Sequence, residues 1–203
     1  VMDLGAVAHL AAIHCRMPFL HFFDGFRTSH EIQKIDALDY EDLRPYVDYD
    51  AIKAFRKNAL NPEHPATRGC TVNPDIFFQC REACNTRFAA IPDAVEHYMD
   101  VINKLTGRDY RIFNYYGAPD AERVIVIMGS GAETAKETVD FLTAKGEKVG
   151  LLVVHLYRPF AADRFLAAMP KTVKKIAVLD RTKEPGAMGE PLYQDVSSLY
   201  KAK

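Results

Sequence analysis

The spacing of apolar and polar residues predicts a helix and then a strand at the start of the chain. Residues 4–15 are rich in alanine and apolar on nearly all sides, which is typical of a helix with several packing neighbours. Arg16 ends this helix, and Pro18 prevents its continuation. The nearly continuous apolar run Phe19–Phe23 is typical of a buried parallel strand, and Asp24-Gly25 closes it.

The next part of the chain is predicted to be helical at first and then irregular. Thr28 and Glu31 have the spacing of a capping box, which predicts the start of another helix. Residues 36–61 have the pattern of short helices that are interrupted at Arg44-Pro45. Because periodicity is poor from there to about Pro92, we expect a long connecting segment.

Strands and helices alternate in the last third of the chain. Before it, a helical stripe over 93–106 is predicted, with Pro92 in the first turn and Gly107 at the end. Apolar runs predict strands over 124–128, 149–156 and 176–180, and amphipathic stretches predict helices over 132–145 and 163–169. This alternation predicts an α/β fold with a parallel sheet and right-handed crossovers.

Composition and charge exclude several classes of protein. The chain has 203 residues, 48% of them apolar, and 26 basic against 27 acidic residues give a formal net charge of −1. It therefore has the composition of a folded globular protein and no basic field to bind nucleic acid or an anionic membrane. No bilayer-spanning run or secretory signal is visible, so we expect a cytoplasmic protein. The helical pattern begins almost at Val1, which indicates a start within a longer polypeptide.

The cysteines give no pattern of metal ligation. Cys15, Cys70, Cys80 and Cys84 contain no C-x-x-C pair and no recurring Cys/His spacing. Structural zinc and iron–sulfur sites show closely spaced ligand pairs, so we expect no metal site in this chain alone. Reduced thiols of a cytosolic protein are the simpler interpretation.

Candidate chemistry lies in the loops that follow the predicted strands, where parallel sheets bind ligands. The first loop, Gly129, Ser130 and Gly131, opens a helix whose free N–H groups and dipole favour an anion. Thr134 stands where a dinucleotide fingerprint requires glycine. Two interpretations stay open: contact with a phosphate or cofactor, or tight strand-to-helix geometry alone.

The other charged clusters do not define a reaction. Arg158-Pro159 follows the second predicted strand, and the loop Asp180–Pro191 could bind a partner or a phosphate, or could be a solvated loop with local ion pairs. A second cluster follows the first predicted strand and comprises Asp24, Arg27, His30 and Glu31. Its carboxylate, guanidinium and imidazole groups could perform acid–base chemistry, although the predicted capping box already explains Glu31. His21 and His155 lie in apolar runs and are interpreted as hydrogen-bonded core histidines.

Several motifs resemble those of pyruvate:ferredoxin (flavodoxin) oxidoreductases. The similarity runs in order from about Leu10 to Val196. The motifs that carry it are Phe22–Lys34, Asn61–Pro65, Asn73–Gln79, Leu156–Phe160 and Ala177–Gly186.

The resemblance implies part of an enzyme that oxidatively decarboxylates pyruvate to acetyl-CoA and passes electrons to ferredoxin or flavodoxin. Its cofactors would be thiamine diphosphate with Mg, iron–sulfur clusters and coenzyme A. Residues 1–35 would be the end of the pyrimidine-binding thiamine domain, 36–119 a partly helical connector, and 120–203 an incomplete transketolase C-terminal-like α/β domain. The partners implied are the remaining domains of the same enzyme, ferredoxin or flavodoxin, and a second subunit in a homodimer.

The resemblance assigns no catalytic residue to this chain. The parts that activate thiamine diphosphate, bind its metal and hold the clusters are missing, so the chain alone is predicted to be inactive and to hold no cofactor other than coenzyme A. The resemblance places Gly129, Ser130 and Gly131 nearest to coenzyme A, and Asp24–Glu31 near subunit contacts. Two alternatives remain: a non-catalytic subunit-docking domain of transketolase-C-like fold, and a nucleotide-binding domain that uses the same glycine loop.

Overall fold

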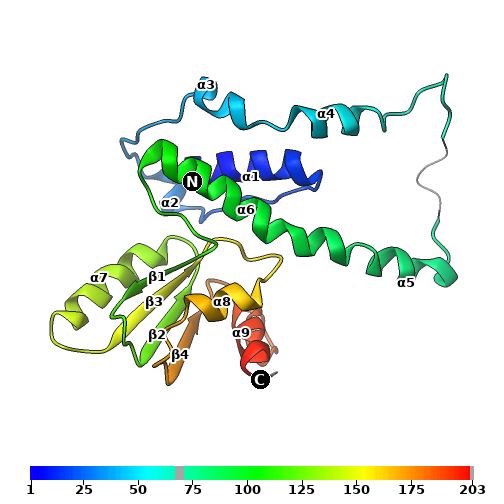
Figure 1. Cartoon of the computed structure of the whole chain (residues 1–203). Helices are drawn as coiled ribbons and strands as arrows, with labels where there is room; N and C mark the ends of the chain where they lie inside the picture. The colour runs from blue at the N-terminus through cyan, green and yellow to red at the C-terminus, as the bar shows by residue number, and fades with distance from the viewer. Residues whose placement is uncertain (67–70, 202–203) are drawn as a thin grey trace. The chain divides into compact units, whose positions relative to one another are not determined.

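The chain forms two compact units, each built from two separate stretches of sequence. The computed structural model describes residues 1–66 and 71–201 (Figure 1). Unit 1 comprises Val1–His21 and Ile35–Asp109, and unit 2 comprises Phe22–Lys34 and Tyr110–Lys203. Cys70, which was expected to be a reduced thiol, lies outside the described residues.

Unit 1 is helical. Its elements are α1 (Met2–Cys15), α3 (Tyr40–Leu43), the 3-10 helix η1 (Arg44–Tyr46), α4 (Tyr49–Arg56), α5 (Pro74–Glu82) and α6 (Asn85–Thr106). The apolar stripe of α6 packs against α1 and buries residues from both helices, which are Val7, Leu10, Ala11, Val95, Tyr98 and Ile102. The first predicted helix is therefore confirmed, and Arg16 ends it in the left-handed conformation with φ of 50°.

Two predictions for the connecting region are wrong. The stretch before Pro92 is not irregular throughout, because it contains α5 and the first turns of α6. Pro92 lies inside α6 rather than in its first turn. A proline removes one backbone hydrogen bond from a helix. Here its neighbours Ile91 and Val95 are buried, so packing of the apolar stripe outweighs that local preference.

Unit 2 contains a four-stranded sheet. Its strands are β1 (Phe113–Gly117), β2 (Arg123–Ile127), β3 (Val149–Val154) and β4 (Lys175–Leu179), in the order β1-β3-β2-β4. Strand β2 pairs in parallel with both β3 and β4, which confirms the predicted α/β fold with a mainly parallel sheet. The antiparallel edge strand β1 pairs with β3 and was not predicted.

Helices α7 (Gly131–Thr143), α8 (Ala162–Ala168) and α9 (Pro191–Lys201) complete unit 2. One core cluster packs α7 against the sheet and contains Ile127, Ala132, Ala135, Val139, Leu151 and Val153. Because strand side chains alternate between faces, the fully buried Leu152 points to the opposite face. The fully buried side chain of Phe165 on α8 makes an edge-on contact with Phe113 of β1.

The predicted strand at Phe19–Phe23 is wrong. These residues form no strand, and the side chains of Leu20, Phe22 and Phe23 are 86%, 60% and 53% exposed. A buried parallel strand needs paired neighbours, and all sheet strands in the described residues lie between Phe113 and Leu179. An apolar run without a partner strand cannot become a core strand.

The predicted capping box is also absent. The short helix α2 (Arg27–His30) begins before the predicted start, with Phe26 at its N-cap position and no side-chain cap. Thr28 therefore lies within the helix, and Glu31 follows its last residue. The Ser29 hydroxyl instead donates a hydrogen bond to the carbonyl of Phe26 over 2.9 Å.

Candidate functional site

The loops that follow β2 and β4 lie at the same edge of the sheet. These neighbouring strands are parallel, and Ile127 pairs with Leu179 at their carboxyl ends. The loop Gly129–Gly131 and the residues Asp180 and Arg181 therefore leave the sheet side by side. This is the edge at which parallel α/β sheets place ligand-binding groups.

Asp24 joins these two loops. One of its carboxylate oxygens, Oδ2, accepts a hydrogen bond from the backbone N–H of Ser130 over 2.5 Å. Its other oxygen, Oδ1, lies 3.1 Å from Nη1 of Arg181, which also donates to the hydroxyl of Ser130 over 2.8 Å. We call Asp24, Ser130 and Arg181 the carboxylate cluster. It brings together three stretches of the chain that lie far apart in sequence.

The electrostatics of the carboxylate cluster favour a charged Asp24. Hydrogen bonds from Ser130 are the main cause that lowers the pKa of Asp24, and the charge of Arg181 adds to them against the opposing effect of burial. The positive end of the α7 dipole acts in the same direction. Asp24 is therefore an anion at neutral pH.

Gly129 allows the carboxylate to come this close. Its φ of +85° lies in the left-handed region, where a side chain is strained. A Cβ at this position would also lie 2.9 Å from Oδ2 of Asp24. Gly129 thus permits both the tight turn and the close approach of an anion. From the sequence, these were two alternative explanations of the glycine.

The anion at the N-terminus of α7 is a protein side chain. The free N–H groups and the dipole of this helix predicted an anionic contact, and the structure places the carboxylate of Asp24 on the N–H of Ser130. A contact between Gly129–Gly131 and coenzyme A stays a prediction. The partner of Ser130 lies 106 positions away in the sequence, so spacing could not have identified it.

The four residues considered for acid–base chemistry do not converge. Asp24 belongs to the carboxylate cluster, whereas the ring nitrogen Nδ1 of His30 hydrogen-bonds to the carbonyl of Phe26 over 2.6 Å. Arg27 and Glu31 are exposed. Acid–base chemistry by this group is therefore not supported by its geometry.

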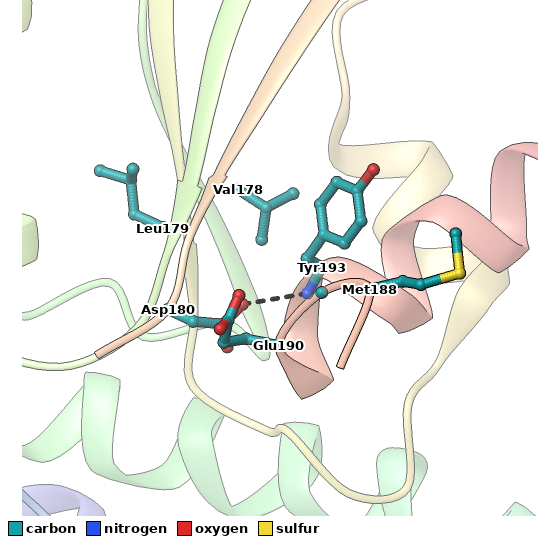
Figure 2. Close-up of a pocket in the computed structure, with 7 residues that line it drawn as sticks. Val178, Leu179, Asp180, Met188, Glu190 and Tyr193 are labelled. Atoms are coloured by element: carbon teal, nitrogen blue, oxygen red, sulfur yellow. Dashed lines mark hydrogen bonds between the residues drawn. The ribbon is translucent and has the colours of Figure 1, made fainter. Parts of the chain in front are cut away.

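An open pocket of about 350 Å³ lies between the end of β4, the loop that follows it and the start of α9. Figure 2 shows its lining, which is Val178, Leu179, Asp180, Met188, Gly189, Glu190 and Tyr193. Asp180 accepts hydrogen bonds from the backbone N–H groups of Leu192 and Tyr193 over 3.2 and 3.1 Å, so it caps α9. Glu190 pairs with Lys183 over 2.9 Å. Both carboxylates are engaged, which favours the interpretation as a loop with local ion pairs.

The loop after β3 is also fixed by internal contacts. Nη1 of Arg158 lies 2.6 Å from Oδ2 of Asp195 on α9. The guanidinium of Arg158 also stacks on the ring of Tyr157, 4.0 Å from its centroid. This arginine therefore ties the loop to α9 within unit 2.

The two histidines that were expected in apolar strands have different environments in the structure. Nδ1 of His155 hydrogen-bonds to the carbonyl of Arg111 over 2.8 Å, and burial lowers the pKa of His155. His155 is therefore hydrogen-bonded as predicted, but it is only half-buried and follows the last residue of β3. His21 is exposed and lies in an irregular stretch, so the prediction of a core histidine in a strand is wrong for this residue. The burial that it does have lowers its pKa.

Unit 1 contains a histidine–carboxylate pair that sequence reasoning missed. Nδ1 of His14 lies 2.9 Å from Oδ2 of Asp48, and Asp48 also accepts the N–H of Ala51 at the start of α4. The hydrogen bond from Ala51 is the main cause that lowers the pKa of Asp48. This pair connects α1 with α4. Its two members are 34 positions apart, so no local motif could show it.

The described part of the chain contains neither a group of metal-ligating side chains nor a bilayer-spanning helix. Among residues 1–66 and 71–201, no three His, Cys, Asp or Glu side chains come together in a way that could hold a metal ion. Cys80 and Cys84 have free thiols, and the thiol of Cys84 contacts the carbonyl of Cys80 over 3.4 Å. In the same stretches, no helix has the length and apolar character needed to cross a bilayer.

Unit 2 is thus a mainly parallel α/β unit with charged loops at the carboxyl edge of its sheet. Two family models identify the chain further. The model described as the thiamine diphosphate-binding part of pyruvate flavodoxin/ferredoxin oxidoreductase matches residues 1–100, and that of pyruvate:ferredoxin oxidoreductase core domain II matches 121–203. The chain belongs to the pyruvate:ferredoxin (flavodoxin) oxidoreductase family.

Curated relatives agree with this assignment. The chain is 63% identical over 200 residues to a pyruvate-flavodoxin oxidoreductase of Enterobacter agglomerans, with 98% of this chain and 17% of the relative covered. It is 61% identical over 199 residues to a pyruvate:ferredoxin oxidoreductase of Moorella thermoacetica, with the same shares covered. A pyruvate dehydrogenase [NADP(+)] of Cryptosporidium parvum is 50% identical over 199 residues, covering 98% of this chain and 10% of the relative. The chain thus spans about 17% of the length of the first two relatives.

Proposed function

We propose that this chain is part of a thiamine-dependent enzyme that oxidatively decarboxylates pyruvate to acetyl-CoA and passes electrons to ferredoxin or flavodoxin. The observation that carries the proposal is the identity of 63% and 61% to relatives named as pyruvate oxidoreductases, over 98% of the chain. Within that enzyme the chain is a scaffold, and it is inactive alone. This role agrees with the observation that its charged loop residues form hydrogen bonds and ion pairs with one another.

The described residues do not fit a thiamine diphosphate site of their own. Magnesium prefers oxygen ligands, so its site would need several carboxylate or carbonyl groups close together. No group of three candidate ligands occurs in residues 1–66 and 71–201, and the free thiols there form no cluster site. When bound in the whole enzyme, thiamine diphosphate would supply the nucleophilic carbon and the electron sink that decarboxylation needs. No catalytic step is assigned to residues of this chain.

The finer proposal is a contact between coenzyme A and Gly129, Ser130 and Gly131. It is supported by the helix N-terminus, which complements a phosphate, and by the position of the loop at the carboxyl edge of the sheet. A phosphate at this loop would have to take the N–H of Ser130 that Asp24 now occupies.

The activity is tested on the full-length protein. Coenzyme A-dependent oxidation of pyruvate, with reduced ferredoxin or flavodoxin as the readout, is the expected result. If neither pyruvate nor another 2-oxoacid is oxidised, the proposed activity is refuted.

The coenzyme A contact is tested separately with Ser130→Asp in the full-length enzyme. The added carboxylate would repel a phosphate at the loop, so we expect KM for coenzyme A to rise while KM for pyruvate stays the same. Thr138→Asp is the matched control, because Thr138 is exposed on the same helix and lies two turns further along. An unchanged KM for coenzyme A in Ser130→Asp refutes the contact and leaves the proposed activity standing.

The organisation of the full-length protein follows from the same proposal. Residues 1–35 would be the last part of the pyrimidine-binding thiamine domain, and residues 120–203 would belong to the transketolase C-terminal-like domain. Residues 36–119 would connect these two domains. The protein would act as a cytoplasmic homodimer. Sedimentation of the full-length protein tests the dimer, and a monomer at micromolar concentration would contradict it.

A further inference from the structure

Residues 22–34 are held in unit 2 through one side chain. Within the stretches 1–66 and 71–201, every hydrogen bond and ion pair that joins this segment to the rest of unit 2 involves Asp24. The other side-chain hydrogen bonds of the segment are local, from Ser29 and His30 to the carbonyl of Phe26. Apolar burial contributes little, because Phe26 and Ile32 are 83% and 100% exposed.

We propose that Asp24 is a charge-dependent latch that holds residues 22–34 on the N-terminus of α7. Each group that faces its carboxylate complements a negative charge: the N–H of Ser130, the positive end of the helix dipole, and the guanidinium of Arg181. Removal of the charge alone, without a change in side-chain size, releases the segment.

The latch joins residues from the two ranges of the chain that the family models match. Residues 22–34 lie within the range 1–100 that matches the thiamine diphosphate-binding part, whereas Ser130 and Arg181 lie within the range 121–203 that matches core domain II. By contacts, however, the segment belongs to the same compact unit as the sheet. Asp24 therefore holds a segment from the first matched range on the sheet unit formed mainly by the second.

The substitution Asp24→Asn removes the charge of the side chain and keeps its size and shape. Its carbonyl oxygen can still accept the N–H of Ser130. It carries no charge for the helix dipole or for Arg181, and its amide group would face the guanidinium with donors only. Glu31→Gln is the matched control, because Glu31 lies in the same segment and is exposed, and its substitution removes the same charge.

The test is hydrogen exchange, followed by mass spectrometry, in the full-length protein. We expect about tenfold faster exchange of peptides from residues 22–34 in Asp24→Asn, since a helix-terminal charge is typically worth up to about that factor. Glu31→Gln should match the wild type, and exchange in β3 should be the same in all variants. Equal exchange of residues 22–34 in Asp24→Asn and the wild type would refute the latch.

A second variant covers the case in which Asp24→Asn perturbs folding and β3 also exchanges faster. Arg181→Gln leaves the bond between Asp24 and Ser130 in place. Because the side chain of Arg181 is 58% exposed, we expect a smaller acceleration, of about twofold to threefold, confined to residues 22–34. No acceleration in Arg181→Gln together with general unfolding of Asp24→Asn would mean that Asp24 has a core-folding role, and this overturns the proposal.

Discussion

Replacement of Gly129 by alanine should damage the structure in two separable ways. The first is backbone strain, because φ at this position is +85° and a side chain in the left-handed region costs about 1–2 kcal/mol. The second is a collision with the latch. The new Cβ would lie 2.9 Å from Oδ2, 3.3 Å from Oδ1 and 3.4 Å from Cγ of Asp24, so the carboxylate has to move.

The chain offers a control for the strain alone. Gly146 has φ of +83°, and a Cβ there would meet nothing within 4 Å. Gly146→Ala should therefore cost about 1–2 kcal/mol of unfolding free energy. Gly129→Ala should cost that amount and about 1–2 kcal/mol more, since the charge of Asp24 is moved away from the helix terminus.

Two measurements separate the contributions. Urea unfolding gives the free energy of each variant, and hydrogen exchange reports residues 22–34 locally. Exchange of this segment should accelerate about tenfold in Gly129→Ala and stay unchanged in Gly146→Ala. In an Asp24→Ala background, Gly129→Ala should cost no more than Gly146→Ala, because the collision partner is gone. Equal effects of the two glycine substitutions in the wild-type background would disprove this reasoning.

Three further predictions concern unit 2. Leu151→Ala in β3, whose side chain is fully buried, should lower the unfolding free energy by about 2–5 kcal/mol, whereas the exposed Leu60→Ala should change it by less than about 0.5 kcal/mol in the same urea titration. Burial lowers the pKa of His155, so the folded state favours its neutral ring. The stability that this provides is complete above the ordinary histidine pKa of about 6.5 and is lost as the pH falls below it. The protection of β3 from hydrogen exchange should therefore fall at low pH, and His155→Gln should reduce this dependence of the protection on pH. Asp180→Ala should remove the cap of α9 at a cost of about 1 kcal/mol, seen as faster exchange in α9 but not in α7.

In unit 2, the elements that the sequence predicted correctly are those with a strong local pattern of apolar residues. The apolar runs of β2, β3 and β4 and the apolar stripe of α7 are each visible in the local sequence, and α7 packs on the sheet that the strands form. Strand β1 gave no such signal because Asn114 interrupts its apolar residues, and only its pairing with β3 defines it. Phe19–Phe23 had the signal of a strand but has no strand beside it in the described residues.

The candidate site was predictable only in part, for a related reason. The chemistry of the loop Gly129–Gly131 is local: free N–H groups at a helix start favour an anion wherever they occur. The identity of that anion is not local, because Asp24 reaches Ser130 across 106 positions. Asp24 was expected to close a strand, and its actual role depends on the tertiary position of a segment that forms no strand.

The latch and the coenzyme A contact compete for the same donor, which relates the two proposals. A tethered carboxylate acts at an effective concentration of about the millimolar range, so a free phosphate must displace it before it can bind the N–H of Ser130. If both proposals hold, Asp24→Asn should lower KM for coenzyme A in the full-length enzyme, while Ser130→Asp raises it. If only the latch holds, Asp24→Asn accelerates exchange of residues 22–34 and leaves KM for coenzyme A unchanged. A lower KM without faster exchange would contradict the latch, because Asp24 would then repel the ligand without holding the segment.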